Sequence, residues 1–308
     1  MPSNKPTRRD VLGFIGAAGI AAAGSTPAFS RSLDLIERRI PSSREAIPAV
    51  GLGTWQTFDV GSQGREREAV REVLREFVAL GGKVIDSSPM YGRSESVVGE
   101  LGSELDIHSS LFLATKVWTE GRQRGIDQME ESVRRLRARR IDLMQVHNLV
   151  DVDIHLKTLA GWKAKGIVRY VGVTHYVASA FPRVERLMKD HPLDFIQINY
   201  SIADRAAAQR ILPLAAERGI AVLVNQPFGG GRLFSTVASK PLPPEAASIG
   251  CSTWAQFFLK FILGHPSVTC VIPATSKVSH LRDNMGAGRG ALPDEETRKK
   301  MIRAFEKL

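Results

Sequence analysis

Short apolar runs rich in β-branched residues recur along the chain, and longer segments with apolar positions at helical spacing separate them. Runs of this length predict β-strands, whereas the longer periodic segments predict α-helices. Two clear helical segments are 65–82, where a glycine pair is suited to a C-cap, and 206–219. The eight predicted strands span residues 49–54, 83–88, 111–117, 142–148, 168–174, 194–200, 221–226 and 268–274.

The alternation of strands and helices predicts the fold class. Strands separated by helices pair in parallel through right-handed crossovers, and eight such units in roughly 240 residues match an α/β protein of the (β/α)8 TIM-barrel type. A doubly wound sheet is the alternative, but GLGTW at 51–55 lacks the third glycine of a G-x-G-x-x-G turn. We predict a single domain, in which 240–250 is a loop before the seventh main helix and 36–48 is a β-hairpin closing the barrel floor.

The N-terminal segment has a different character. Arg8 and Arg9 precede thirteen residues without charge, 11–23, followed by small residues at 25–30. Thirteen residues are too few for a membrane span, which needs about 20. A basic start, a modest apolar stretch and small residues are typical of a cleavable export signal, and the adjacent arginines favour the twin-arginine type. An ordinary secretory signal or a disordered tail is the alternative.

We therefore expect residues 1–30 to be a twin-arginine signal peptide removed on export, and 31–308 to be the barrel domain. The implied partner is the twin-arginine translocation machinery, and the implied location is the periplasm. A non-functional signal would leave the protein in the cytoplasm. No stable membrane insertion is expected.

The composition and the net charge are consistent with an enzyme that has a (β/α)8 fold. Apolar residues make up 43% of the chain, which suits a sizeable core. The net charge of +10 is concentrated in part in the run RRLRARR at 134–140, but its place at the end of a helix starting near Ile126 favours a solvated face over a nucleic-acid site. Cys251 and Cys270 have no metal-binding spacing, and two free buried thiols are expected rather than one disulfide.

Polar residues gather where barrel enzymes build their sites, at the carboxyl ends of the strands and in the loops that follow. The second strand begins with KVID, which ends on Asp86, and the loop SPMYG that comes after it contains Tyr91. The third strand ends in ATKVW with Lys116, and the fourth in QVHN with His147. Each residue alone is a weak signal, because a single charge or histidine at a barrel rim is usually structural. Their occurrence on consecutive strands predicts an active site.

The chemistry available to these residues follows from their properties. A tyrosine hydroxyl, with an ordinary pKa of about 10, donates a proton poorly at neutral pH unless a nearby cation lowers that pKa. Lys116 can be the cation, and Asp86 can hold Lys116 in place. His147 can hydrogen-bond a substrate carbonyl beside the tyrosine. Such a group protonates a developing alkoxide and therefore needs a hydride source.

The sequence resembles the aldo-keto reductase superfamily in the motifs that carry its catalytic tetrad. These motifs occur here in the order KVID, SPMYG, ATKVW and QVHN. The resemblance runs from about Ile40 to the C-terminus and includes GLGTW, GVTHY, QINYS and VIPATSKVSHLRDN. Members of that superfamily transfer a hydride between a nicotinamide cofactor, usually NADPH, and a carbonyl compound or alcohol. The resemblance implies that Tyr91 is the general acid, that Lys116 and Asp86 tune its pKa, and that His147 orients the carbonyl. It implies no metal.

The resemblance also implies residues that hold the nicotinamide. The family's Ser-Asn pair and Gln, which hold the carboxamide, correspond here to Thr174, His175 and Gln197. Asn225 stands where the family often places an aromatic ring against the nicotinamide, and an amide cannot stack in the same way.

The phosphate end of the cofactor is implied by two further segments. The loop NQPFGGGRLF keeps the family's proline and glycines, which allow close backbone approach to a pyrophosphate. Two positions that the family often uses as basic residues on the 2′-phosphate are Ala274 and His280 here, whereas the polar residues Thr275, Ser276, Lys277 and Asn284 remain available. NADP(H) is therefore still preferred, and NAD(H) is the alternative. The implied cofactor residues are Gly53, Thr54, Thr174, His175, Gln197, Asn225, Pro227, Phe228, Gly229, Thr275, Ser276, Lys277, His280 and Asn284.

The substrate is expected to be a small carbonyl compound or alcohol. Trp55 and Trp118 follow strands one and three and are expected, with Asn148, to line the substrate mouth, although packing within the barrel is the alternative for the two tryptophans. The preferred function is NADP(H)-dependent reduction of aldehydes or ketones, or the reverse oxidation, by a monomer. The alternative is a cofactor-loaded, non-catalytic regulatory or binding subunit on the same scaffold. A metal-dependent hydrolase is disfavoured because the chain lacks an H-x-H or carboxylate cluster.

Overall fold

The eight barrel strands coincide with the eight apolar runs of the sequence. The computed structural model describes residues 34–308, so the predicted signal at 1–30 lies outside the described residues. All eight strands pair in parallel, in the order β10-β9-β8-β7-β6-β5-β4-β3, which confirms the predicted barrel. Their bounds are β3 (Leu52–Gly53), β4 (Val84–Asp86), β5 (Phe112–Val117), β6 (Ile141–His147), β7 (Val168–Thr174), β8 (Phe195–Asn199), β9 (Ala221–Asn225) and β10 (Cys270–Val271).

The first and last strands close the barrel through isolated bridges rather than a continuous ladder. Val50 bridges to Val271, and Gly53 bridges to Ala274, both in parallel. The strands β3 and β10 are therefore shorter than the predicted runs 49–54 and 268–274. Pro273 contributes to the short pairing because it has no N–H to donate to a neighbouring strand.

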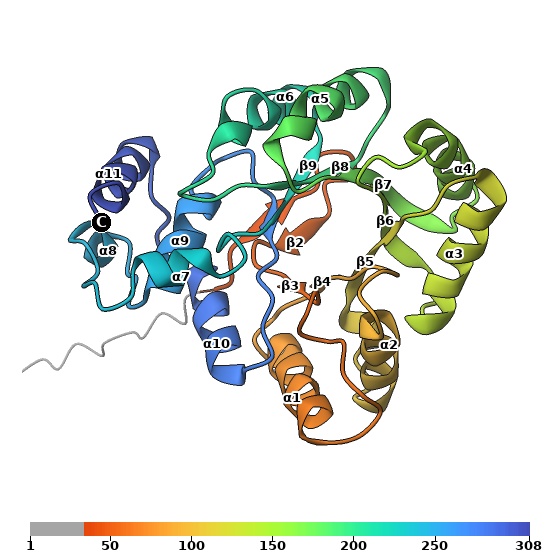
Figure 1. The fold of residues 1–308 in the computed structure, drawn as a ribbon, viewed down its shortest axis with the longest axis horizontal. Helices are drawn as coiled ribbons and strands as arrows, with labels where there is room; N and C mark the ends of the chain where they lie inside the picture. Colours follow the sequence, from red (N-terminus) through yellow and green to blue (C-terminus); the bar gives the residue numbers. More distant parts are fainter. Residues whose placement is uncertain (1–33) are drawn as a thin grey trace, which may run out of the picture. The chain divides into compact units, whose positions relative to one another are not determined.

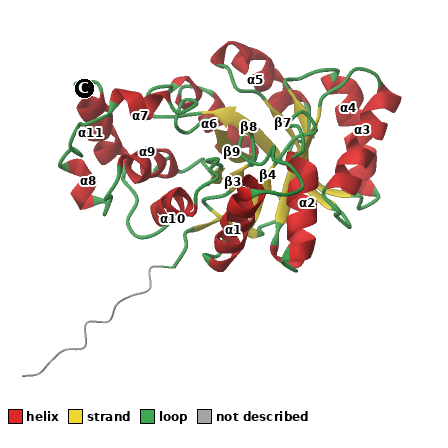
Figure 2. Ribbon diagram, turned by 60° about the horizontal axis from the view of Figure 1, so that its bottom comes forward, coloured by secondary structure: helices red, strands yellow, loops and turns green. Residues whose placement is uncertain are grey.

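Helices surround the strands, as Figures 1 and 2 show. The main helices that follow the eight strands are α1 (Arg65–Ala79), α2 (Ser94–Glu104), α3 (Arg122–Arg135), α4 (Val152–Ala164), α5 (Phe181–Asp190), α6 (Ile211–Arg218), α9 (Trp254–Leu263) and α10 (Val278–Ala287). Additional helices are α7 (Arg232–Thr236), α8 (Glu245–Ser248) and α11 (Glu295–Phe305), with 3-10 turns η1 (His108–Ser110), η2 (Ala178–Ala180) and η3 (Ala206–Ala208).

Several helix boundaries differ from the predicted ones. Helix α1 stops before the predicted glycine pair, where Gly81 takes a φ of 89° that terminates the helix. The predicted helix 206–219 is divided into η3 and α6, because the ring of Pro213 is tolerated only in the first turn of a helix. Helix α3 begins at Arg122, earlier than the predicted start near Ile126. The segment 240–250, predicted as loop, contains the one-turn helix α8.

A β-hairpin closes the floor of the barrel, as predicted for 36–48. Strands β1 (Glu37–Arg39) and β2 (Ala46–Pro48) pair antiparallel. The adjoining side chains of Ile40 and Ile47 are buried in one cluster with inward-facing residues of the barrel strands. The strand residues of that cluster include Val84, Phe112, Leu143, Tyr170, Phe195 and Leu223.

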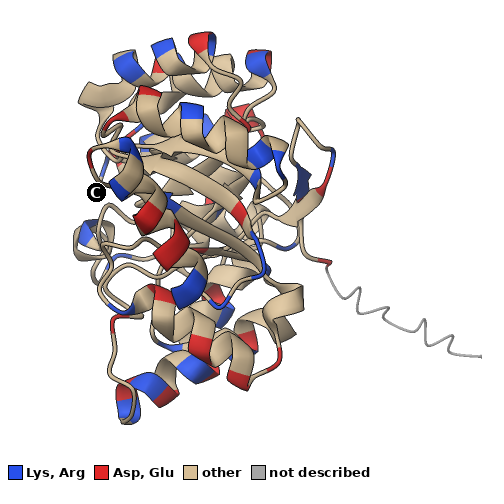
Figure 3. Cartoon of the chain, turned by 90° about the vertical axis from the view of Figure 1, so that its right-hand side faces the viewer, with Lys and Arg blue, Asp and Glu red and all other residues tan. Residues whose placement is uncertain are grey.

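The remaining expectations concern charge, thiols and membranes. Arg134 and Arg135, at the end of α3, pair with Glu131 on the helix surface, and Figure 3 shows basic and acidic residues interspersed on this side of the molecule. Cys251 and Cys270 are buried, free thiols. Within 34–308 no helix is long and apolar enough to cross a membrane.

The floor cluster leads to a stability prediction. Replacing Ile47, which is 1% exposed, with alanine should leave a cavity and lower the free energy of unfolding by roughly 2 to 5 kcal/mol. Urea denaturation measures this change. Ile154→Ala on α4 is the matched control, because Ile154 is 41% exposed and its truncation should change stability by less than about 0.5 kcal/mol. Equal effects of the two substitutions would show that the hairpin does not seal the barrel.

Candidate active site

A buried ion pair joins β4 and β5 near the carboxyl end of the barrel. Lys116 Nζ lies 2.6 Å from Asp86 Oδ2 and 2.6 Å from the carbonyl oxygen of Ser87. The two strands pair with Asp86 opposite Ala114, so that Lys116, two residues further on, points to the same side of the sheet. Burial opposes the charge of Lys116, but Asp86 and Tyr91 outweigh it and raise the lysine pKa above its ordinary value.

The loop after β4 carries Tyr91 over this ion pair. Lys116 Nζ lies 4.9 Å from the centroid of the tyrosine ring. Burial raises the pKa of Tyr91, and Lys116 lowers it by a smaller amount, so the net pKa is above the ordinary value. The lowering expected from the sequence is thus present but outweighed. At neutral pH the phenol keeps its proton, which is the state that a proton donor needs.

His147 ends β6 beside the tyrosine. The two rings pack edge to face with centroids 6.3 Å apart, and Ser88 Oγ lies 3.4 Å from His147 Nδ1. Burial, and then the nearby charges of Lys116 and His175, lower the pKa of His147 to about 3. A neutral imidazole can donate one hydrogen bond to a carbonyl oxygen without competing with Tyr91 as an acid.

The structure therefore brings together the four residues predicted from three consecutive strands. The arrangement places a protonated phenol and a neutral imidazole next to a fully buried ammonium. Donors preorganised in this way stabilise negative charge as it develops on a substrate oxygen.

A residue that the sequence reasoning missed completes the surroundings of Asp86. Gln145 Nε2 donates to Asp86 Oδ1 over 3.1 Å, and Gln197 Nε2 donates to the same oxygen over 2.8 Å. Gln145 lies two residues before His147 on β6, so strand alternation places both on the inner face. That alternation was the available signal, because it marks Gln145 as a polar residue pointing into the barrel.

The predicted nicotinamide residues of β7, β8 and β9 meet at the same end. Thr174 Oγ1 donates to Gln197 Oε1 over 3.2 Å. Asn225 Nδ2 lies 3.4 Å both from that oxygen and from the carbonyl oxygen of His175. His175 Nδ1 accepts from the backbone N–H of Tyr176 over 3.0 Å. The structure thus connects this group to Asp86 through Gln197.

The glycine loop after β9 adopts backbone conformations that are unfavourable for residues with a side chain. Gly229, Gly230 and Gly231 have φ angles of 57°, 67° and 90°, in the left-handed region. Pro227 is buried, and the ring of Phe228 packs against Phe234 with centroids 4.8 Å apart.

The segment leading into α10 presents a mixed polar group. Thr275 is buried and its Oγ1 accepts from the backbone N–H of Lys277 over 3.1 Å. Ser276, Lys277 and His280 are exposed, and Asn284 is buried further along α10. The first turn of this ten-residue helix offers backbone N–H groups beside an exposed ammonium.

Two predicted cofactor residues lie in the closing seam of the barrel. A Cβ on Gly53 would lie 2.9 Å from the carbonyl oxygen of Ile272, so glycine permits the close approach of β3 to this segment. Thr54 is fully buried, and its hydroxyl lies 3.1 Å from the Asp86 carbonyl oxygen and 3.0 Å from Ser87 Oγ.

The predicted substrate residues lie at or near the exposed end of the site. Trp55 and Trp118 are 48% and 41% exposed, and the Trp118 ring centroid is 6.5 Å from that of His147. Asn148 has a φ of 53°, and its buried Oδ1 has no hydrogen-bond partner among residues 34–308. Met90, the neighbour of Tyr91, is 40% exposed and was not predicted as a substrate residue.

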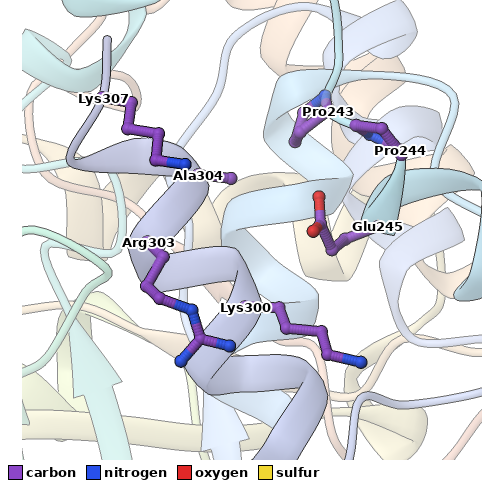
Figure 4. Close-up of a pocket in the computed structure, with 7 residues that line it drawn as sticks. All are labelled: Pro243, Pro244, Glu245, Lys300, Arg303, Ala304 and Lys307. Atoms are coloured by element: carbon purple, nitrogen blue, oxygen red, sulfur yellow. The ribbon is translucent and has the colours of Figure 1, made fainter.

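A hollow elsewhere on the surface is lined by none of the tetrad residues. It has a volume of about 480 Å³ and lies between the α8 region and α11, as Figure 4 shows. Within 34–308, no group of three His, Cys, Asp or Glu side chains is placed to bind a metal ion. The lining residues of the hollow are Pro243, Pro244, Glu245, Lys300, Arg303, Ala304 and Lys307.

Comparison with known proteins agrees with this geometry. The model of the aldo/keto reductase family matches residues 49–300, which is most of the chain. The chain belongs to the aldo/keto reductase family.

Curated relatives of this aldo/keto reductase include a named reductase and a named dehydrogenase. Methylglyoxal reductase YeaE of Escherichia coli is 28% identical over 246 residues, covering 78% of this chain and 84% of that protein. Pyridoxine 4-dehydrogenase of the same organism is 29% identical over 278 residues, covering 82% and 93%.

Solved structures share the fold of this aldo/keto reductase. An aldo-keto reductase from Klebsiella pneumoniae in complex with NADPH has a TM-score of 0.74 at 22% identity, covering 88% of this chain and 96% of that chain. Aldo-keto reductase AKR11C1 from Bacillus halodurans, in its holo form, has a TM-score of 0.71 at 22% identity with the same coverage.

The low pKa of His147 predicts a pH-dependent stability. Between about pH 6.5 and pH 3 the unfolded chain binds a proton on this histidine that the folded chain does not bind, so folding becomes less favourable as the pH falls. From pH 6 to pH 4 this histidine should reduce the free energy of unfolding by about 1.4 kcal/mol per pH unit.

Urea denaturation at several pH values, comparing the wild type with His147→Gln, measures this slope. The variant should lose less stability on acidification. Parallel pH profiles for the two proteins would contradict a buried, neutral His147.

Proposed function

We propose that this aldo/keto reductase reduces aldehydes or ketones with NADP(H), or runs the reverse oxidation, with Tyr91 as the proton donor and acceptor. The observation that carries the proposal is the position of the Tyr91 ring 4.9 Å from Lys116 Nζ, with Lys116 held 2.6 Å from Asp86. A non-catalytic binding subunit would not need a buried ammonium beneath a phenol.

The residues present fit a nicotinamide dinucleotide. Within 34–308 the buried Oδ1 atoms of Asn148 and Asn225 have no partner, and such acceptors suit an amide N–H or a hydroxyl group. The three glycines at 229–231 leave backbone exposed to a pyrophosphate. Lys277 and the N-terminus of α10 supply positive charge for a further phosphate, which supports NADP(H) over NAD(H). Three structural relatives were solved as complexes with NADP or NADPH.

In this proposal the residues of the protein itself carry out the proton transfer. A nicotinamide held by these residues would supply the hydride for the carbonyl carbon. The phenol of Tyr91 donates its proton to the carbonyl oxygen as negative charge develops there. The ammonium of Lys116 then faces the phenolate that remains and stabilises it, because a buried ammonium attracts an opposite charge more strongly than one in water does. Asp86 keeps the ammonium charged and in place throughout.

His147 orients the carbonyl in this proposal. Its neutral ring packs against Tyr91, so an N–H of the imidazole and the O–H of the phenol can converge on one oxygen atom. Trp55, Met90 and Trp118 are exposed apolar residues that follow β3, β4 and β5 at this end of the barrel, which suits a substrate with apolar surface around its carbonyl group.

We further propose that residues 1–30 direct export through the twin-arginine pathway after the barrel has folded around its cofactor. Free nicotinamide cofactor is scarce outside the cytoplasm, so an exported reductase needs a cofactor that it binds tightly and that a second substrate regenerates. The adjacent Arg8 and Arg9 support this proposal.

Tyr91→Phe tests the catalytic proposal. Loss of the proton donor should lower kcat/KM for aldehydes by about 10²- to 10⁴-fold, while NADPH binding measured by fluorescence should change little. The assay follows NADPH oxidation with a panel of aldehydes and ketones. Tyr176→Phe is the matched control, because Tyr176 is 47% exposed and lies outside the tetrad. Unchanged turnover in Tyr91→Phe would remove Tyr91 from the mechanism.

Replacing both Arg8 and Arg9 with lysine tests the export proposal. The double variant should accumulate in the cytoplasm, whereas the wild type should reach the periplasm with nicotinamide bound. Cell fractionation and ultraviolet spectra of the purified protein measure both properties. Arg31→Lys is the control for a general effect of charge-conserving changes. Wild-type protein that is exported without nicotinamide would contradict the folded-export proposal.

A further inference from the structure

The two oxygens of the Asp86 carboxylate have different partners. Oδ2 faces the ammonium of Lys116 at 2.6 Å, whereas Oδ1 accepts two side-chain amide hydrogen bonds, from Gln197 at 2.8 Å and Gln145 at 3.1 Å. Both glutamines are buried, with exposures of 2% and 0%. A buried carboxylate with both oxygens occupied cannot rotate without breaking several hydrogen bonds.

The two amides also determine each other's orientation. Gln197 Nε2 donates to Gln145 Oε1 over 3.2 Å, while Gln197 Oε1 accepts from Thr174 and Asn225. Turning the Gln145 amide over would place its oxygen against the Asp86 carboxylate and its NH2 group against that of Gln197. Only one orientation of Gln145 therefore satisfies all its neighbours.

The strand register explains why Gln145 occupies this place. On β6 it lies opposite Lys116 of β5 and Gly172 of β7. It precedes His147 by two residues on the inner face and lies deeper in the barrel. Its side-chain hydrogen bonds join it to Asp86 and Gln197, so an effect on the reaction is expected to pass through Asp86.

We propose that Gln145 is a positioning residue for proton transfer: with Gln197 it holds Asp86 so that one carboxylate oxygen faces Lys116 and the other is satisfied by amides. This proposal rests on the proposed function in treating Tyr91 as the proton donor. The amide of Gln145 has two tasks, donation to Asp86 and acceptance from Gln197, and only a correctly oriented amide performs both.

The proposal predicts an effect on the ionisation of Tyr91. Amide donors partly neutralise the Asp86 carboxylate, whose negative charge raises the pKa of Tyr91, while Lys116 lowers it. Losing a donor should therefore raise the Tyr91 pKa further. Three other titratable groups lie close to this network. The charge of Lys116 affects the pKa of His147 and of Glu95 on α2. The charge of Asp86 affects the pKa of Cys270 on β10.

The test is a pH titration of tyrosine by NMR on protein carrying carbon-13 at the tyrosine ζ position. The chain has four tyrosines, and Tyr91→Phe identifies the Tyr91 signal. Gln145→Met keeps the volume but removes both hydrogen bonds, and should move the Tyr91 titration upward by about half a pH unit. Gln145→Glu places a second carboxyl group against Asp86 and should move it upward by more than about one pH unit.

Met144→Ala is the matched control. Met144 is the strand neighbour of Gln145, is also fully buried, and belongs to the packing layer outside the barrel. Its truncation should lower the melting temperature but leave the Tyr91 titration unchanged. An unchanged titration in folded Gln145→Met, or an equal displacement in Met144→Ala, would overturn the proposal.

A measurement on the wild type covers the case in which the Gln145 variants do not fold. Nitrogen-15 relaxation of side-chain amides should show that the NH2 groups of Gln145 and Gln197 are as rigid as the backbone of β6. A freely rotating Gln145 amide would overturn the proposal without any substitution.

Kinetics separate this proposal from the proposed function. If the wild type reduces carbonyl compounds, Gln145→Met should lower kcat about tenfold with little change in KM, because Gln145 does not touch the substrate. A change confined to KM would contradict a positioning role. If the wild type reduces no carbonyl compound, the proposed function fails, while the tyrosine titration still decides whether Gln145 positions Asp86.

Discussion

The ion pair between Lys116 and Asp86 is the interaction on which the rest of the site depends. A fully buried ammonium is unfavourable unless an anion and hydrogen-bond acceptors replace its lost water. Here Asp86 and the Ser87 carbonyl oxygen supply both. Removing either partner would leave the other charge buried and unpaired, so the pair persists as a unit. The ammonium is thereby held 4.9 Å from the centre of the Tyr91 ring, where the proposed role of that tyrosine needs a cation.

The parallel barrel makes this pair possible through its strand register. Inward positions alternate along each strand, so β5 presents Phe112, Ala114 and Lys116 to the interior in turn. On β6 the same positions carry Leu143, Gln145 and His147. The interior is therefore apolar near the hairpin floor and polar near the carboxyl end. The apolar layers exclude water from below, which strengthens every electrostatic interaction above them.

Periodicity predicted the fold, because apolar runs and helical spacing are local features of the sequence. Asp86, Lys116 and His147 lie near the ends of three successive apolar runs, and parallel pairing places such ends together. The strand ends at the seam were less predictable, because β3 and β10 close the barrel through contacts between residues about 220 positions apart. Gln145 was missed because alternation marks it as inward-facing without showing what it contacts. Its role appears only when the register brings Asp86 and Gln197 beside it.

The charges of the site also explain why we propose a tyrosine as the proton donor. Burial and nearby charges lower the pKa of His147 to about 3, so at neutral pH its ring is uncharged and carries a single N–H. Lys116 could release a proton only by leaving Asp86 as an unpaired buried anion. Tyr91 keeps its proton because burial raises its pKa, yet the phenolate left after transfer would face Lys116 directly. Among these groups, Tyr91 alone is both protonated at rest and stabilised after losing its proton.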